Sequence, residues 1–272
     1  MRFIFPRKTD ILPLKYEPKG ETMRKILCCA VFLCAGVCGW AQLQKSCPIA
    51  DVVPTENITS LEINPSLEVP KGEKDTSLSK LTLKAYYAFD KYLNVGVEVP
   101  LARFESPAQS KNGLGDVNFS ISANRFYGEV WSFGSTLEVV TPTASDDSLG
   151  AGKLQLNPSV YGVYMPQGNF FFALGYKQYW SVAGDGGRDT INQGRIRSVI
   201  AYLSNAKWWA LVDPRYIMDY ENAGQAQFAP EAEIGTMINE GSSIYLRGGG
   251  KMGGNMPGNE WLVSVGFRIL HL

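Results

Sequence analysis

The feature that most constrains the fold of this chain is a regular alternation of apolar and polar residues over long segments, from about residue 58 onward. In one segment, Leu93, Val95, Val97 and Val99 alternate with Asn94, Gly96 and Glu98. The segment from Trp261 to Ile269 shows the same alternation near the end of the chain. Because successive side chains of a β-strand point to opposite faces, the pattern predicts strands with one apolar and one polar face.

Segments of this kind recur along the whole region. The predicted strands are 60–69, 79–89, 92–104, 114–126, 129–141, 153–165, 169–182, 194–204, 207–219, 226–239, 242–252 and 260–272. Many are longer than the usual five or six residues of strands in soluble proteins. They match the length of about 9–11 residues that a tilted strand needs to cross a bilayer.

The connections between these segments alternate in length. Short turns are expected at Asp90-Lys91, Tyr127-Gly128, Pro166-Gln167-Gly168, Asn205-Ala206 and Glu240-Gly241, whereas longer polar loops such as 105–113 and 183–193 follow the other strands. Short periplasmic turns and long extracellular loops are typical of bacterial outer-membrane barrels. An open sheet edge cannot face lipid, so the last strand must pair with the first. The fold class is therefore predicted to be all-β, a closed antiparallel transmembrane β-barrel of about twelve strands.

Aromatic residues cluster near both ends of the predicted strands. Those near the short turns are Phe89, Phe126, Trp131, Tyr164, Phe170, Tyr202 and Trp208, and those near the long loops are Phe104, Trp180, Tyr216, Tyr220, Phe228 and Trp261. Amphipathic rings favour the headgroup level of a bilayer, so two aromatic girdles are expected.

The N-terminal part resembles an export signal. Met23-Arg24-Lys25 precedes an apolar run from Ile26 to Val37, and Gly39-Trp40-Ala41 supplies small residues for cleavage after Ala41. A membrane anchor is the alternative, but the run is shorter than the ~20 residues that a span requires. The predicted organisation is an upstream extension plus signal peptide at 1–41 (signal 23–41), a periplasmic lead-in at 42–57 and the barrel at 58–272. The expected location is the outer membrane of a Gram-negative-type cell, and the true start is either Met1 or Met23.

Composition excludes several other function classes. The 26 basic and 26 acidic residues balance, so no nucleic-acid partner is expected. Of five cysteines only Cys47 follows the signal, and His271 is the only histidine. Without a suitable histidine base or a Cys/His cluster, neither an enzyme, nor a metal site, nor another cofactor is predicted.

The polar positions of the alternating strands must face inward, away from lipid, and many of them are charged. The expected lumen-facing residues are Glu62, Glu68, Lys80, Lys84, Glu98, Asp116, Glu138, Lys177, Arg195, Arg197, Lys207, Asp213, Arg215, Asp219, Glu231, Glu233, Arg247, Lys251 and Arg268. The candidate site within this set is a charge network of Arg197, Asp213, Arg215, Glu231, Glu233, Arg247 and Lys251. Counting across the short turns brings Arg215 opposite Glu231, and Arg247 or Lys251 near Glu231 and Glu233. Two interpretations stay open: a salt-bridged interior that fills a narrow barrel, or a polar pathway that selects solutes.

Two short stretches carry a family resemblance. Lys111-Asn112-Gly113-Leu114-Gly115-Asp116-Val117-Asn118-Phe119 and Gly150-Ala151-Gly152-Lys153-Leu154-Gln155-Leu156-Asn157-Pro158 resemble strand openings of the MetA-pathway phenol-degradation outer-membrane family. The resemblance implies a membrane β-barrel that acts as a channel or transporter for small solutes, including aromatic or hydrophobic ones. A closed barrel with a structural or surface-interaction role is the alternative. The expected partners are outer-membrane lipid, the barrel-assembly machinery during biogenesis and a small solute.

Overall fold

The computed structural model describes residues 57–270 except 74, 167, 205–206 and 223. The predicted extension and signal peptide, the lead-in before Asn57 and His271 lie outside the described residues. Within the described part, no helix is long and apolar enough to cross a membrane.

The chain forms strands with short interruptions. They are β1 (Ser60–Pro70), β2 (Ser77–Ala88), β3 (Leu93–Ser106), β4 (Gln109–Leu114), β5 (Asn118–Tyr127), β6 (Trp131–Val140), β7 (Lys153–Tyr164), β8 (Phe170–Gly184), β9 (Asn192–Ser204), β10 (Trp208–Asp213), β11 (Arg215–Asp219), β12 (Gln225–Phe228), β13 (Glu231–Asn239), β14 (Ser242–Gly249), β15 (Gly253–Gly254) and β16 (Asn259–Leu270).

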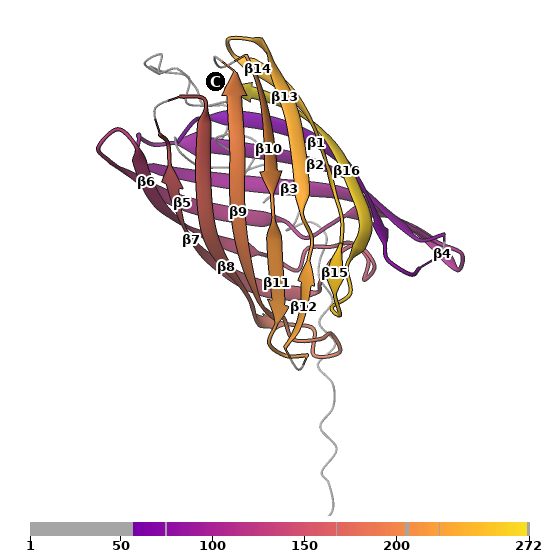
Figure 1. Cartoon of the computed structure of the whole chain (residues 1–272). Coiled ribbons are helices and arrows are strands. Elements are labelled where there is room, and N and C mark those ends of the chain that lie inside the picture. Colours follow the sequence, from indigo (N-terminus) through magenta and orange to yellow (C-terminus); the bar gives the residue numbers. More distant parts are fainter. Residues whose placement is uncertain (1–56, 74, 167, 205–206, 223, 271–272) are drawn as a thin grey trace, which may run out of the picture. The chain divides into compact units, whose positions relative to one another are not determined.

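These segments build one closed antiparallel sheet (Figure 1). The pairs β4/β5, β10/β11, β12/β13 and β14/β15 each follow one path along the wall, so the barrel has twelve strands. The barrel closes where β1 pairs with β16, from Ser60 opposite Leu270 to Pro70 opposite Asn259. The predicted closed antiparallel barrel of about twelve strands is confirmed. Figure 1 also shows the β3–β4 hairpin projecting from the wall at the long-loop end.

Two predicted strands contain a break that the alternation did not reveal. Pro214 separates β10 from β11, and Ala229-Pro230 separates β12 from β13. The carbonyls of both prolines still accept hydrogen bonds, from Ser198 N at 3.1 Å and from Gly250 N at 3.3 Å. Because proline has no N–H to return these bonds, the ladder is weakened at both points while the inward and outward faces continue unchanged.

The outer face of the barrel is apolar. Large exposed side chains include Leu61, Ile63, Leu83, Phe119, Ile121, Leu137, Val160, Leu174, Ile234 and Val265. Near the short turns, ring centroids of Trp131 and Tyr164 lie 4.7 Å apart, and Tyr202 lies 5.1 Å from Phe170 and 5.3 Å from Trp208. The other end exposes Trp180, Tyr216, Tyr220, Phe228 and Trp261. An apolar surface of this extent, with aromatic rings at both ends, is that of a transmembrane β-barrel.

Aromatic side chains on the inner face lie opposite glycines. The register pairs Tyr86 with Gly96, Tyr161 with Gly134, Trp209 with Gly235 and Tyr245 with Gly266. A Cβ atom on any of these glycines would overlap the ring across from it. The rings therefore lie flat against the neighbouring strand, which keeps large side chains along the wall.

Candidate functional site

The candidate site is the charge network on the inner face of β9–β14, and its centre is Asp213. The Asp213 side chain is completely buried and accepts bonds from two arginines on either side. Arg197 on β9 donates from Nε at 3.1 Å and from Nη2 at 2.6 Å. Arg215, at the start of β11, donates from Nε at 2.9 Å and from Nη2 at 2.7 Å. One carboxylate thus holds two guanidinium groups at the point where Pro214 interrupts the strand.

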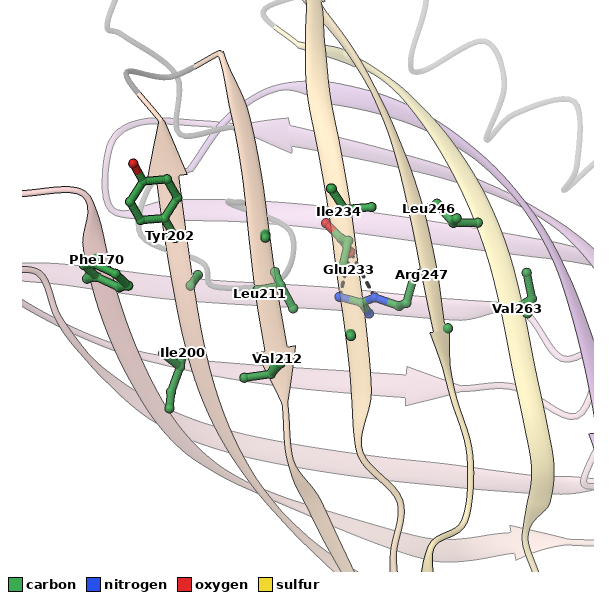
Figure 2. Close-up of a pocket in the computed structure, with 14 residues that line it drawn as sticks. Phe170, Ile200, Tyr202, Leu211, Val212, Glu233, Ile234, Leu246, Arg247 and Val263 are labelled. Carbon is green, nitrogen blue, oxygen red and sulfur yellow. Dashed lines mark hydrogen bonds and ion pairs between the residues drawn. The ribbon is translucent and has the colours of Figure 1, made fainter.

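The network continues along β13 and β14. Arg215 forms an ion pair with Glu231, and Arg247 Nη1 lies 3.7 Å from the other oxygen of the same carboxylate. Arg247 Nε donates to Glu233 Oε2 at 2.9 Å, the contact drawn in Figure 2. The seventh predicted member, Lys251, donates from Nζ to the carbonyl of Met256 at 2.6 Å. In the described part of the chain it forms no ion pair with Glu231 or Glu233.

The same network crosses the seam where the barrel closes. Arg268 on β16 lies directly opposite Glu62 on β1, with Nε 2.6 Å from Oε2. Lys84 Nζ lies 3.0 Å from Glu62 Oε1, and Tyr245 donates its hydroxyl to Glu62 at 2.8 Å. Arg268 also reaches Glu233 at 4.0 Å. Sequence parity placed these residues on the inner face, but it gave no reason to join the first and last strands through them.

Several of the remaining predicted lumen charges have partners outside this network. Lys177 pairs with Glu138, and Lys80 Nζ lies 2.8 Å from Glu68 Oε1. Glu98 accepts the Tyr86 hydroxyl at 2.6 Å. The lumen-facing prediction is wrong for Lys207, which lies exposed in the turn before β10 because that strand begins only at Trp208.

Asp116 anchors a loop. Its Oδ1 accepts the Ala144 N–H at 3.1 Å, and its Oδ2 accepts the Ala151 N–H at 2.6 Å. Gly150 packs so closely on Asp116 that a Cβ atom would meet the carboxylate. The Gly-Leu-Gly-Asp stretch and the Gly-Ala-Gly stretch at 150–152 are therefore two halves of one contact that holds the 141–152 loop at the long-loop end.

Toward the short turns, the inner face of β7–β10 becomes apolar. Val163, Phe171, Val199, Ala201, Trp209, Leu211 and Tyr245 form a buried cluster. Trp209 is completely buried, and its indole N–H donates to Glu233 Oε1 at 2.7 Å. This bond connects the apolar cluster to the charge network.

The outer side of the same wall carries a groove of about 600 Å³ (Figure 2). The small residues Ala210, Ala232 and Gly248 line it together with flanking larger side chains such as Ile234 and Leu246. Those flanking side chains are exposed and apolar, which suits contact with lipid chains. Among the described residues, no group of three or more Asp, Glu, His or Cys side chains is arranged to hold a metal ion.

No protein-family model matches the chain, and no curated protein matches it either. Solved structures do. The COG4313 outer membrane channel from Pseudomonas putida F1 matches with a TM-score of 0.64 and 11% identity, covering 85% of this chain and 99% of that one. The fold is that of outer-membrane β-barrels. The NanC porin matches this barrel with a TM-score of 0.57 and 13% identity, over 78% of this chain and 100% of the porin. For the KdgM porin the values are 0.55 and 12%, over 77% and 98%.

Proposed function

We propose that this protein is a channel of the outer membrane that lets small solutes pass through its lumen. The observation that carries the proposal is the contrast between the two faces of a closed wall, apolar outside and charged inside. Lipid contact accounts for the outer face. The inner face offers polar groups along the route that a solute would take.

The solutes proposed are small and include aromatic or hydrophobic compounds. This class is the one that the family resemblance implies. The two motifs at 111–119 and 150–158 support membership of the MetA-pathway phenol-degradation family. Export by a cleaved signal peptide and insertion by the barrel-assembly machinery belong to the same proposal. The absence of enzyme activity stays a prediction.

Planar-bilayer recordings of the refolded barrel test the proposal. We expect discrete conductance steps that disappear when the protein is omitted. Replacing Trp209 with Ala removes the largest side chain of the apolar cluster, so the step size should increase. Silence at every voltage and with every solute would contradict the channel function.

A second candidate is a closed barrel with a structural or surface-interaction role. The ion pairs that link β9 to β2 across the seam favour it, because they brace the interior. Liposome swelling separates the two functions. A channel admits a small neutral solute and swells the vesicles, whereas a braced, closed barrel leaves them unchanged.

A further inference from the structure

Arg195 differs from the other arginines on the inner face of β9–β14. The register places it between Lys177 on β8 and Ile217 on β11. Arg197, Arg215 and Arg247 each contact a carboxylate. Among the described residues, Arg195 forms no ion pair, and its buried Nε has no hydrogen-bond acceptor. In the described part of the lumen, the guanidinium of Arg195 thus has no counter-ion.

The surroundings of Arg195 hold it in place without neutralising it. Its guanidinium carbon lies 4.8 Å from the ring centroid of Tyr179, a cation–π contact that orients the planar group. Lys177 Nζ lies 4.9 Å from the same centroid. Lys177 forms an ion pair with Glu138.

The next carboxylate along the wall is already occupied. Asp219 lies opposite Gln193, two positions from Arg195. Its oxygens accept bonds from Gln193 and Asn222 side chains and from the N–H groups of Glu221 and Asn222. Asp219 is therefore held by the β11–β12 turn, and it leaves the guanidinium of Arg195 unpaired.

We propose that Arg195, oriented by Tyr179, is a binding subsite for the carboxylate of a small organic anion within the lumen. A guanidinium fork binds a carboxylate through two parallel hydrogen bonds, and such charge-assisted bonds are the strong ones. Leaving a partly buried charge unpaired is costly, and a bound carboxylate would supply the counter-ion that Arg195 lacks. This subsite deepens the proposed channel function, on which its biological meaning rests, by naming the charge of the solute.

Binding is measured on the refolded barrel in detergent by titration calorimetry, with benzoate as the probe and benzyl alcohol as its neutral counterpart. We expect benzoate to bind the unmodified barrel and Arg195→Gln to weaken binding about tenfold, the loss of one hydrogen-bonded charge. Arg103→Gln is the matched control, because Arg103 is an exposed arginine of the projecting hairpin that pairs with Glu105. It should leave the affinity unchanged.

Two results would overturn the subsite: equal benzoate affinity in Arg195→Gln and the unmodified barrel, or equal binding of benzyl alcohol and benzoate. If Arg195→Gln does not fold, as judged by heat-dependent gel migration, Arg195→Lys carries the test. Lysine keeps the positive charge but lacks the planar guanidinium that makes two parallel hydrogen bonds, so this variant should weaken binding about threefold. An unchanged affinity would again contradict the proposal. Conductance is recorded separately. A silent barrel that binds benzoate through Arg195 refutes the channel and retains the subsite, whereas a conducting barrel with Arg195-independent binding refutes the subsite alone.

Discussion

At the scale of single residues, Asp213 is the side chain on which the charge network depends most. It is fully buried and contacts both Arg197 and Arg215. Replacing it with Asn keeps the shape and removes the charge, which leaves Arg197 without its carboxylate partner and Arg215 with Glu231 alone. We expect a loss of about 2–4 kcal/mol in unfolding free energy, in the range for breaking a buried ion pair and reduced because Arg197 is partly exposed. Urea unfolding in lipid vesicles, followed by tryptophan fluorescence, measures it.

The control for this substitution is Asp147→Asn. Asp147 also pairs with an arginine, Arg188, at 3.3 Å, but its side chain is 92% exposed in a loop. Removing an exposed ion pair costs little, so the unfolding transition should barely shift. Equal losses in Asp213→Asn and Asp147→Asn would show that the lumen is as well solvated as the loop.

Gly235 provides a second prediction at this scale, because the Trp209 ring occupies the space where a Cβ atom would be. Gly235→Ala should push the ring away from the wall and destabilise the barrel by about 1–3 kcal/mol, the usual cost of overpacking. Gly248→Ala is the matched control, since the atom nearest to its Cβ would be 3.6 Å away in ordinary contact. A stability loss of the same size in both variants would contradict the role of Gly235.

The alternation predicted which side most of the charged residues take, because side chains on a strand point to opposite faces in turn. It failed for Lys207, which lies exposed in a turn, and for Asp116, which anchors a loop. It also brought Arg215 and Glu231 together, since the turn between their strands is short. Closure between the first and last strands was predicted, but the Arg268–Glu62 pair was not, because these residues lie 206 positions apart and the alternation does not fix the register of the two strands. The unpaired state of Arg195 was equally out of reach, since it depends on how Asp219 and Glu138 are used elsewhere.

At the scale of elements, most strands and short turns followed from the alternation, but the proline breaks did not. The prediction of a polar loop at 105–113 was wrong, because most of these residues belong to the β3–β4 hairpin. Pro214 occupies a position whose neighbours Asp213 and Arg215 keep the same parity, so the hydrophobic pattern continues through it. The connection at 142–152 was implied by the predicted strands, but its anchor was missed for a different reason. In the alternation, Asp116 occupies a position that predicts a lumen-facing side chain. Only the structure shows that it accepts hydrogen bonds from amides of this loop.

Releasing this anchor is the prediction at the element scale. Asp116→Ala removes two charge-assisted bonds to Ala144 and Ala151, so the loop should open locally while the barrel stays intact. Hydrogen exchange at the Leu149 amide, which bonds to the Asp146 carbonyl at 3.0 Å, reports the opening and should become at least about tenfold faster. Asp189→Ala, in a neighbouring loop and exposed, should leave this amide unaffected. Unchanged exchange in Asp116→Ala would contradict the anchor.

The same loop has a defined response to acid. Hydrogen bonds from the Ser148 N–H and hydroxyl, together with Lys111, lower the pKa of Asp146 to about 2 from its usual 3.8. Because the pKa is lower in the folded loop, the carboxylate favours the folded loop above pH about 4 and loses this effect as the pH falls through about 2. An NMR titration of the Asp146 carboxyl carbon should show no change between pH 7 and 4. A midpoint near 4 would contradict the structure.

At the scale of the whole molecule, the essential property is that the barrel wall separates lipid on its outer face from the lumen on its inner face. Substitutions at neighbouring residues of one strand can test both environments. Ile121 is exposed on the outer face of β5, and Ser120 lies beside it on the inner face opposite Glu138. Ile121→Lys places a charge in lipid and should cost about 2–4 kcal/mol in a bilayer, whereas Ser120→Lys places it next to a carboxylate and should cost much less.

The comparison is decisive because the two substitutions add the same group one residue apart. Unfolding free energies in lipid vesicles should differ by at least about 1 kcal/mol in favour of Ser120→Lys, given the cost of a lysine in the bilayer. In detergent micelles, where the outer face is less strictly excluded from water, the difference should shrink. A one-residue shift in the register of β5 would reverse the order of the two variants, since every side chain would then exchange faces. The sign of this difference therefore tests the lipid-facing surface and the register of β5 in a single measurement.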